Sequence, residues 1–125
     1  MKMKMLHPVA VLVTLFFLAG PLCAHHGTAA YDTEKSLTLK GVVTSFEFIN
    51  PHAEIRVDVA DENGRTVNWL AETNNPNRLA RRGWNRNLLK AGDVITIVGN
   101  PVKSGNPNLR LTKVVLADGR EFDPL

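Results

Sequence analysis

Cysteine is nearly absent from this chain, since Cys23 is its one thiol. Because Cys23 lies at the end of an apolar N-terminal segment, a chain from which that segment is removed has no disulfide. The same removal excludes a thiolate nucleophile and a thiolate metal site. A Ser-His-Asp order, an HExxH motif and a glycine-rich phosphate loop are also missing from the sequence. A small domain with these absences is more typical of a binding protein than of an enzyme.

A large excess of charge of one sign is missing as well. The chain has 15 basic and 12 acidic residues, and removal of Lys2 and Lys4 with the N-terminal segment leaves 13 against 12. The basic pI therefore comes partly from that segment. Such a balance gives little support for a nucleic-acid or membrane-surface partner, so we expect neither.

Residues 1–24 have the features of a secretory signal peptide. Lys2 and Lys4 precede an uncharged apolar run at 9–20, Pro21 ends it, and Leu22-Cys23-Ala24 approximates a small-residue cleavage site. The sequence therefore predicts an exported protein, periplasmic or secreted, without stable membrane insertion after cleavage.

Two other uses of this segment are less favoured. A retained anchor needs about 20 apolar residues, and the run at 9–20 has twelve. Lipidation of Cys23 normally needs a small residue directly before the cysteine, and Leu22 occupies that position.

Short alternating segments separated by turn signals dominate the rest of the chain. Asn-Pro pairs begin at Asn50, Asn75, Asn100 and Asn106, all between the expected elements. Asp61-Glu62-Asn63-Gly64 indicates a hairpin turn, and Asp118-Gly119 a turn into a short tail. The expected elements are strands at 37–48, 53–60, 66–72, 94–99 and 109–116, with a short helix at 75–84.

The order β-β-β-α-β-β predicts a mainly β, five-stranded OB-type barrel with one short helix. The first strand is long, contains Gly41 and changes its apolar face, which indicates a bend or bulge. An open antiparallel sheet with one helix over an end is the alternative. The predicted organisation is a signal peptide at 1–24, an N-terminal arm at 25–35 and the OB-like domain at 36–125.

Several short motifs are distributed along the chain after residue 24. They are His25-His26-Gly27, Gly41-Val42-Val43, Asn50-Pro51-His52, Trp69, Arg81-Arg82-Gly83-Trp84, Leu89-Lys90-Ala91-Gly92-Asp93 and Asp118-Gly119. In this combination the chain resembles a group of small exported bacterial proteins of unknown function. The resemblance covers nearly all of the sequence after the predicted signal peptide, and it implies an exported single domain without an established activity.

Three histidines form a candidate metal site. Cleavage after Ala24 would place a free α-amine and an imidazole on His25, with His26 beside it and His52 in the Asn-Pro-His segment. An amine with two imidazoles suits Cu(II) above all, with Zn(II) or Ni(II) as alternatives. The amine loses its proton readily near neutral pH, because its ordinary pKa is about 7.7.

Other interpretations of these histidines stay open. Cleavage after Cys23 would place histidine third, which creates a different Cu(II) or Ni(II) chelate that uses backbone amides. His25 and His26 can also be solvated arm residues, and His52 can shape its turn through a backbone hydrogen bond. Acid–base chemistry by His52 is a further alternative.

A basic cluster is the second candidate site. It comprises Arg78, Arg81, Arg82 and Arg86, with Trp84 among them. Such a cluster can bind a phosphate, another anion or an acidic protein surface. It can equally be a solvated helix face whose aliphatic stems cover the barrel end.

Two functions follow as expectations. The first is a small exported metal-binding protein, most simply for copper, that uses His25 with His26 or His52 to sequester or deliver the ion. The second is a metal-free periplasmic interaction module that binds a protein, a peptide or a small anionic ligand through the barrel and the arginine cluster.

Overall fold

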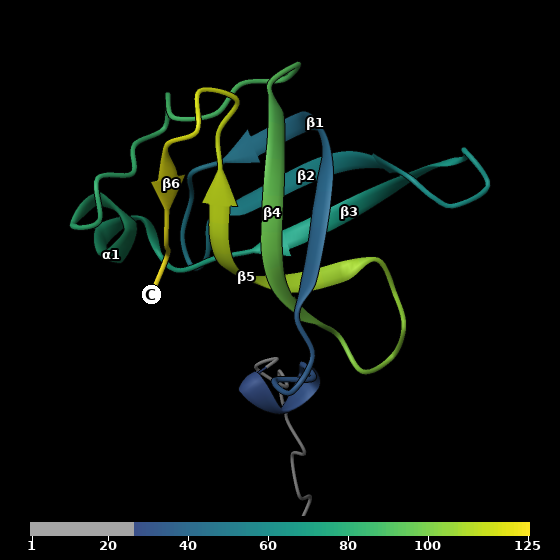
Figure 1. Ribbon diagram of the computed structural model, residues 1–125. Helices are drawn as coiled ribbons and strands as arrows, with labels where there is room; N and C mark the ends of the chain where they lie inside the picture. Colours follow the sequence, from purple (N-terminus) through teal and green to yellow (C-terminus); the bar gives the residue numbers. More distant parts are fainter. Residues whose placement is uncertain (1–26) are drawn as a thin grey trace, which may run out of the picture.

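The computed structural model describes residues 27–125. The predicted signal peptide, His25 and His26 lie outside the described residues. The elements run in the order η1 (Thr28–Ala30), β1 (Leu37–Glu47), β2 (Glu54–Ala60), β3 (Thr66–Glu72), α1 (Pro76–Ala80), β4 (Val94–Pro101), β5 (Asn108–Val115) and β6 (Glu121–Phe122) (Figure 1).

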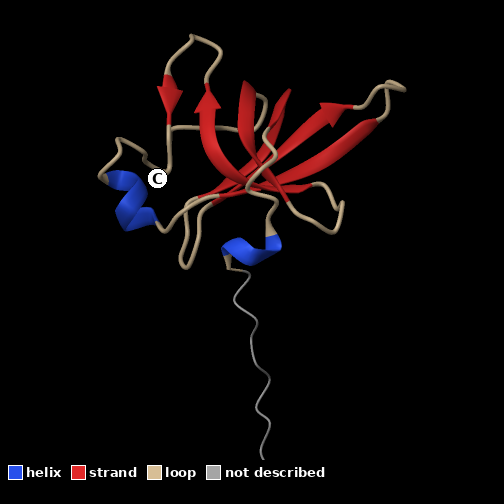
Figure 2. Cartoon of the chain, turned by 60° about the horizontal axis from the view of Figure 1, so that its bottom comes forward, coloured by secondary structure: helices blue, strands red, loops and turns tan. Residues whose placement is uncertain are grey.

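Strands β1 to β5 form a closed barrel. β1 pairs antiparallel with both β2 and β4, β2 pairs with β3, and β4 pairs with β5. A short parallel pairing of β3 with β5, from Leu70 opposite Asn108 to Glu72 opposite Arg110, closes the circle. This confirms the predicted OB-type order and excludes the open sheet. Figure 2 shows the curved strands, with α1 beside the barrel and η1 below it.

The length of β1 allows it to serve two sides of the barrel. Its first half pairs with β4 and its second half with β2, and the β2 register shifts between Val43 and Ser45. A shift of one residue reverses the face to which side chains point. Val43 is therefore buried before the shift and Phe46 packs on the core after it, which confirms the bend or bulge predicted there.

The core fills the barrel and continues under α1. It is almost entirely aliphatic, and no polar or charged residue among residues 27–125 is buried. The buried residues of this core cluster are Val43, Ala53, Ile55, Val57, Val59, Ala71, Leu79, Trp84, Leu89, Ile95, Ile97, Leu109, Leu111 and Val114. Burial of this apolar surface is the main favourable term in folding.

Helix α1 is a single short segment with a clear start. The Asn75 side chain accepts a hydrogen bond from the Arg78 backbone N–H at 3.0 Å, and Pro76 occupies the first turn. Leu79 anchors the helix in the core with no exposed surface. Among residues 27–125 no helix is long and apolar enough to cross a membrane.

The end of the chain differs from the predicted tail. Asp118-Gly119 makes the expected turn, but Glu121 and Phe122 then pair with Val115 and Val114 as strand β6. Two residues are too few to show an alternating pattern, so this strand has no sequence signal of its own. It forms because Phe122 packs against the core.

Candidate functional site

The arm segment that precedes β1 is docked on one end of the barrel. Tyr31 is 3% exposed and forms an isolated antiparallel bridge with Val102. The Asp32 N–H donates to Pro101 O at 2.8 Å, and the Lys103 N–H donates to Ala30 O at 3.0 Å. A segment predicted only as a polar arm is therefore fixed against the loop that joins β4 to β5.

A polar cluster holds the Tyr31 side chain. Its hydroxyl donates a short hydrogen bond to Glu72 Oε2, and Asn108 Nδ2 donates to Glu72 Oε1 at 3.2 Å. Burial raises the pKa of the Tyr31 hydroxyl above its ordinary range, and the hydrogen bond to Glu72 raises it further. The phenol therefore stays protonated and remains a donor at neutral pH.

This cluster lines a hollow of about 450 Å³ between the arm, the end of β3 and the β4–β5 loop. Glu72 is its one charged lining residue. Asn108 Oδ1 is buried and has no hydrogen-bond partner within residues 27–125. The lining residues are Ala30, Tyr31, Glu72, Val102, Ser104, Asn106 and Asn108.

His52 lies in the connection between β1 and β2 and is exposed. The residue after it is fixed, since the Ala53 N–H donates to Asn74 O at 2.9 Å and Ala53 O accepts from Thr73. The His52 imidazole itself has no hydrogen-bond partner in the described part of the chain.

The strand register brings the His52 segment to the end of the barrel that carries the arm. Glu54 lies opposite Glu72 in the β2–β3 pairing, and His52 precedes Glu54 by two residues. Glu72 in turn accepts the Tyr31 hydroxyl hydrogen bond. Within residues 27–125, however, no three His, Cys, Asp or Glu side chains lie close enough to hold a metal ion.

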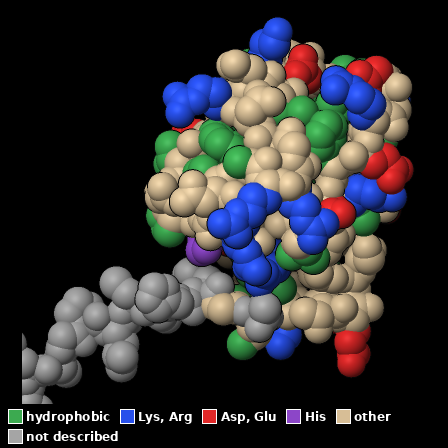
Figure 3. All heavy atoms as spheres, turned by 90° about the vertical axis from the view of Figure 1, so that its left-hand side faces the viewer, with side chains coloured by type: hydrophobic (Ala, Val, Ile, Leu, Met, Phe, Trp, Pro, Cys, Tyr) green, Lys and Arg blue, Asp and Glu red, His purple; other side chains and the backbone are tan. Residues whose placement is uncertain are grey.

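The predicted basic cluster lies on and after α1. The face of the molecule that carries α1 bears a group of Lys and Arg side chains (Figure 3). Arg78, Arg81 and Arg82 line a shallow hollow of about 140 Å³ with Pro124 and Leu125. Arg82 also forms an ion pair with Asp123 at 2.8 Å. The exposed Arg86 is not among the residues that line this hollow.

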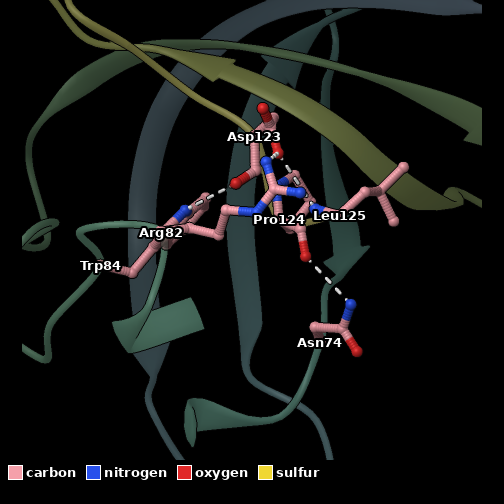
Figure 4. A network of polar contacts seen from close by, with 6 residues as sticks. All are labelled: Asn74, Arg82, Trp84, Asp123, Pro124 and Leu125. Atoms are coloured by element: carbon pink, nitrogen blue, oxygen red, sulfur yellow. Dashed lines mark hydrogen bonds and ion pairs between the residues drawn. The ribbon is translucent and has the colours of Figure 1, made fainter. Parts of the chain in front are cut away.

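Trp84 lies apart from these exposed arginines in the core. It is 2% exposed, and its Nε1 donates to Asp123 O at 3.1 Å. Figure 4 shows Arg82 and Trp84 directed at Asp123, while Asn74 Nδ2 donates to Pro124 O at 2.9 Å. The tryptophan therefore fastens the C-terminal segment to the barrel and offers no open ring face to a ligand.

Sequence reasoning did not identify the Tyr31–Glu72–Asn108 cluster. The three residues are distant in the chain, since Tyr31 and Glu72 are 41 positions apart and Glu72 and Asn108 are 36 apart. One signal was available, because Tyr31 is the single tyrosine of the chain and lies in an otherwise polar arm. A buried partner for it could not be named before the barrel end was assembled.

Comparison with known proteins identifies a family and little else. No curated protein sequence matches the chain. The crystal structure of TiaS in complex with an isoleucine tRNA and ATP shares 20% sequence identity with a TM-score of 0.48, over 69% of this chain and 19% of that chain. The family of unknown function DUF6152 matches residues 13–110. That match covers most of the sequence, and the chain therefore belongs to the family of unknown function DUF6152.

Proposed function

We propose that this protein is an exported metal-binding protein that takes up copper through the histidines that follow its signal segment. The ligands are the α-amine and imidazole of His25, with His26 or His52 as a further nitrogen ligand. Its role is to sequester the ion or deliver it. Zinc and nickel are the alternatives for the same nitrogen ligands.

The docking of Tyr31 carries this proposal. His26 precedes Tyr31 by five residues, a length that spans up to about 17 Å. Neighbouring strands lie about 5 Å apart, so a segment of this length can reach across them from Tyr31 toward His52. The anchor at Glu72 and the exposed His52 belong to the same barrel end. Docking also restricts the arm, so less entropy is lost when its histidines are fixed around a metal.

The exposure of His52 supports the same proposal. A histidine that only shaped its turn would use its ring in a backbone hydrogen bond, and within residues 27–125 the ring makes none. Neutral imidazole is a common metal ligand in such a position. Binding would release protons from its ligands, so we expect the affinity to be lower at acidic pH.

A Cu(II) titration of protein that begins at His25, followed by calorimetry and EPR, tests the proposal. We expect one-to-one binding with nitrogen hyperfine structure. Acetylation of the His25 α-amine should remove the chelate, because an amide nitrogen no longer offers its lone pair to the metal; an added residue would instead place a histidine third and create the other chelate. His52→Ala should weaken binding if His52 is a ligand, while His26→Ala tests the other choice. Weak binding that is indifferent to all three changes would exclude the N-terminal site.

The alternative function is a metal-free interaction module for a protein, a peptide or a small anionic ligand. One observation favours it: Arg78 and Arg81 form no ion pair within the described residues, and they line the small hollow beside α1. Recovery of a periplasmic partner that is lost in Arg78→Ala and Arg81→Ala, but kept after each of the three changes at the metal site, would support this function.

A further inference from the structure

We propose that the hollow beside Tyr31 is a binding site for a small organic cation, an alkylammonium group with N–H donors. This site is separate from the copper ligands, because His52 is not among its lining residues.

The charge of the hollow comes from Glu72. Lysine and arginine residues form no ion pair with this carboxylate within residues 27–125, although Arg110 lies opposite it in the β3–β5 register. Glu54 lies opposite it on the other side, in the β2–β3 register. Arg110 and Glu54 carry opposite charges on the two sides of Glu72, and both act on the Tyr31 hydroxyl. The Glu72 carboxylate has no ion-pair partner within residues 27–125, so it attracts a cation and repels an anion.

The hydrogen-bonding groups call for further donors. An ionised carboxylate has about four acceptor positions, and Glu72 receives two hydrogen bonds, from Tyr31 and Asn108. The contact with Glu72 also fixes the Asn108 amide, because rotation would turn its oxygen toward a carboxylate. Asn108 Oδ1 is thereby left buried without a donor. The two acceptor positions left on Glu72 match a guest with N–H donors, whereas the buried Asn108 Oδ1 is closed to a guest.

The shape and remaining walls favour a short alkyl chain on the cation. Ala30, Val102 and the ring of Tyr31 provide apolar surface next to the polar cluster. A volume of about 450 Å³ admits a chain of several carbons with its ammonium group. Inorganic cations would leave this apolar surface uncovered, so an amine fits the hollow better.

The test is an NMR titration of the purified protein with n-pentylamine, n-pentanol and sodium pentanoate at neutral pH in the presence of EDTA. EDTA removes copper, so the outcome does not depend on the metal proposal. We expect saturable shifts of the Tyr31, Glu72 and Asn108 amides with the amine alone. Equal shifts with the neutral alcohol would overturn the proposal. So would changes confined to the apolar hollow beside Trp69, which Leu39 and Val67 also line.

A variant separates the charge from the shape. Glu72→Gln keeps an acceptor for the Tyr31 hydroxyl but removes the negative charge. We expect the affinity for the amine to fall about tenfold. Glu47→Gln, an exposed carboxylate at the end of β1, should leave the affinity unchanged. Unchanged affinity in Glu72→Gln would also overturn the proposal. The comparison of the three ligands uses the natural chain, so it holds even if Glu72→Gln fails to fold.

Discussion

Tyr31 illustrates how one side chain decides the position of a whole segment. Its ring is buried against the β4–β5 loop, and its hydroxyl reaches Glu72 on β3. Without this residue the preceding chain would have few apolar contacts, and the ordering entropy of the arm would be hard to offset. Tyr31 therefore connects the candidate metal ligands to the barrel.

The titration of Tyr31 tests this environment directly, because it is the single tyrosine of the chain. Burial and Glu72 raise its pKa above the ordinary 10.0. The unfolded chain then loses its proton first as the pH rises, so the stability from the neutral phenol is complete below pH 10 and falls above it. Ultraviolet absorbance of the native protein should show no tyrosinate at pH 10.0, the ordinary pKa of tyrosine.

Glu72→Gln provides the control for that titration. It removes the negative charge but leaves the burial, so the pKa of Tyr31 should fall and still remain above the ordinary value. A native tyrosine that titrates normally in both proteins would mean that the arm is not docked in solution.

Strand β1 shows how a single element can belong to two sides of a barrel. Its N-terminal half pairs with β4 and its C-terminal half pairs with β2. Gly41 lies where these pairings meet, and a Cβ atom there would collide with Asp58 O and with Val57 Cγ1. Since one of those atoms belongs to the backbone, a side chain cannot simply displace it. The close approach of β1 and β2 therefore requires glycine.

Gly41→Ala should accordingly lower the free energy of unfolding by about 1–3 kcal/mol, because β1 and β2 must separate to admit the methyl group. Chemical denaturation followed by circular dichroism measures this change. The neighbouring exposed Lys40 gives a matched control on the same strand. Lys40→Ala should change the stability by less than about 0.5 kcal/mol. Equal stability of the two variants would show that the strands are not this close.

In residues 27–125, all five barrel strands and α1 contribute to a single core. The parallel β3–β5 pairing closes it, and Trp84 fastens the C-terminal segment across it through Asp123. Because none of these elements buries its apolar face alone, we expect the barrel to unfold as one cooperative unit.

Two single-tryptophan proteins test this cooperativity. Trp69→Phe leaves the buried Trp84 as the fluorophore, and Trp84→Phe leaves the half-buried Trp69. In each protein, fluorescence and circular dichroism should give coincident denaturation curves. Trp84→Phe should be the less stable, since it also loses the hydrogen bond to Asp123. Separate transitions would show that β3 and the α1 region unfold independently.

Much of the fold was predictable because it is encoded locally. The range 66–72 of the third strand agrees with β3, and α1 lies within the helix predicted at 75–84, although it ends at Ala80. The OB-type order followed from these local signals combined with the length of the first strand. By contrast, Glu121–Phe122 was not predicted as a strand, because it depends on the edge that β5 provides.

The sequence by itself determined local features: the alternation of the strands, the turns, and histidines that directly follow an apolar N-terminal segment. The tertiary structure alone decided which distant groups meet. It brought the Tyr31 hydroxyl into a hydrogen bond with Glu72 and left Asn108 Oδ1 without a partner within residues 27–125. It also buried Trp84 in the core, away from the exposed arginines. The physical reason is that strand period and turn propensity act over a few residues, whereas barrel closure depends on pairing between strands far apart in the chain.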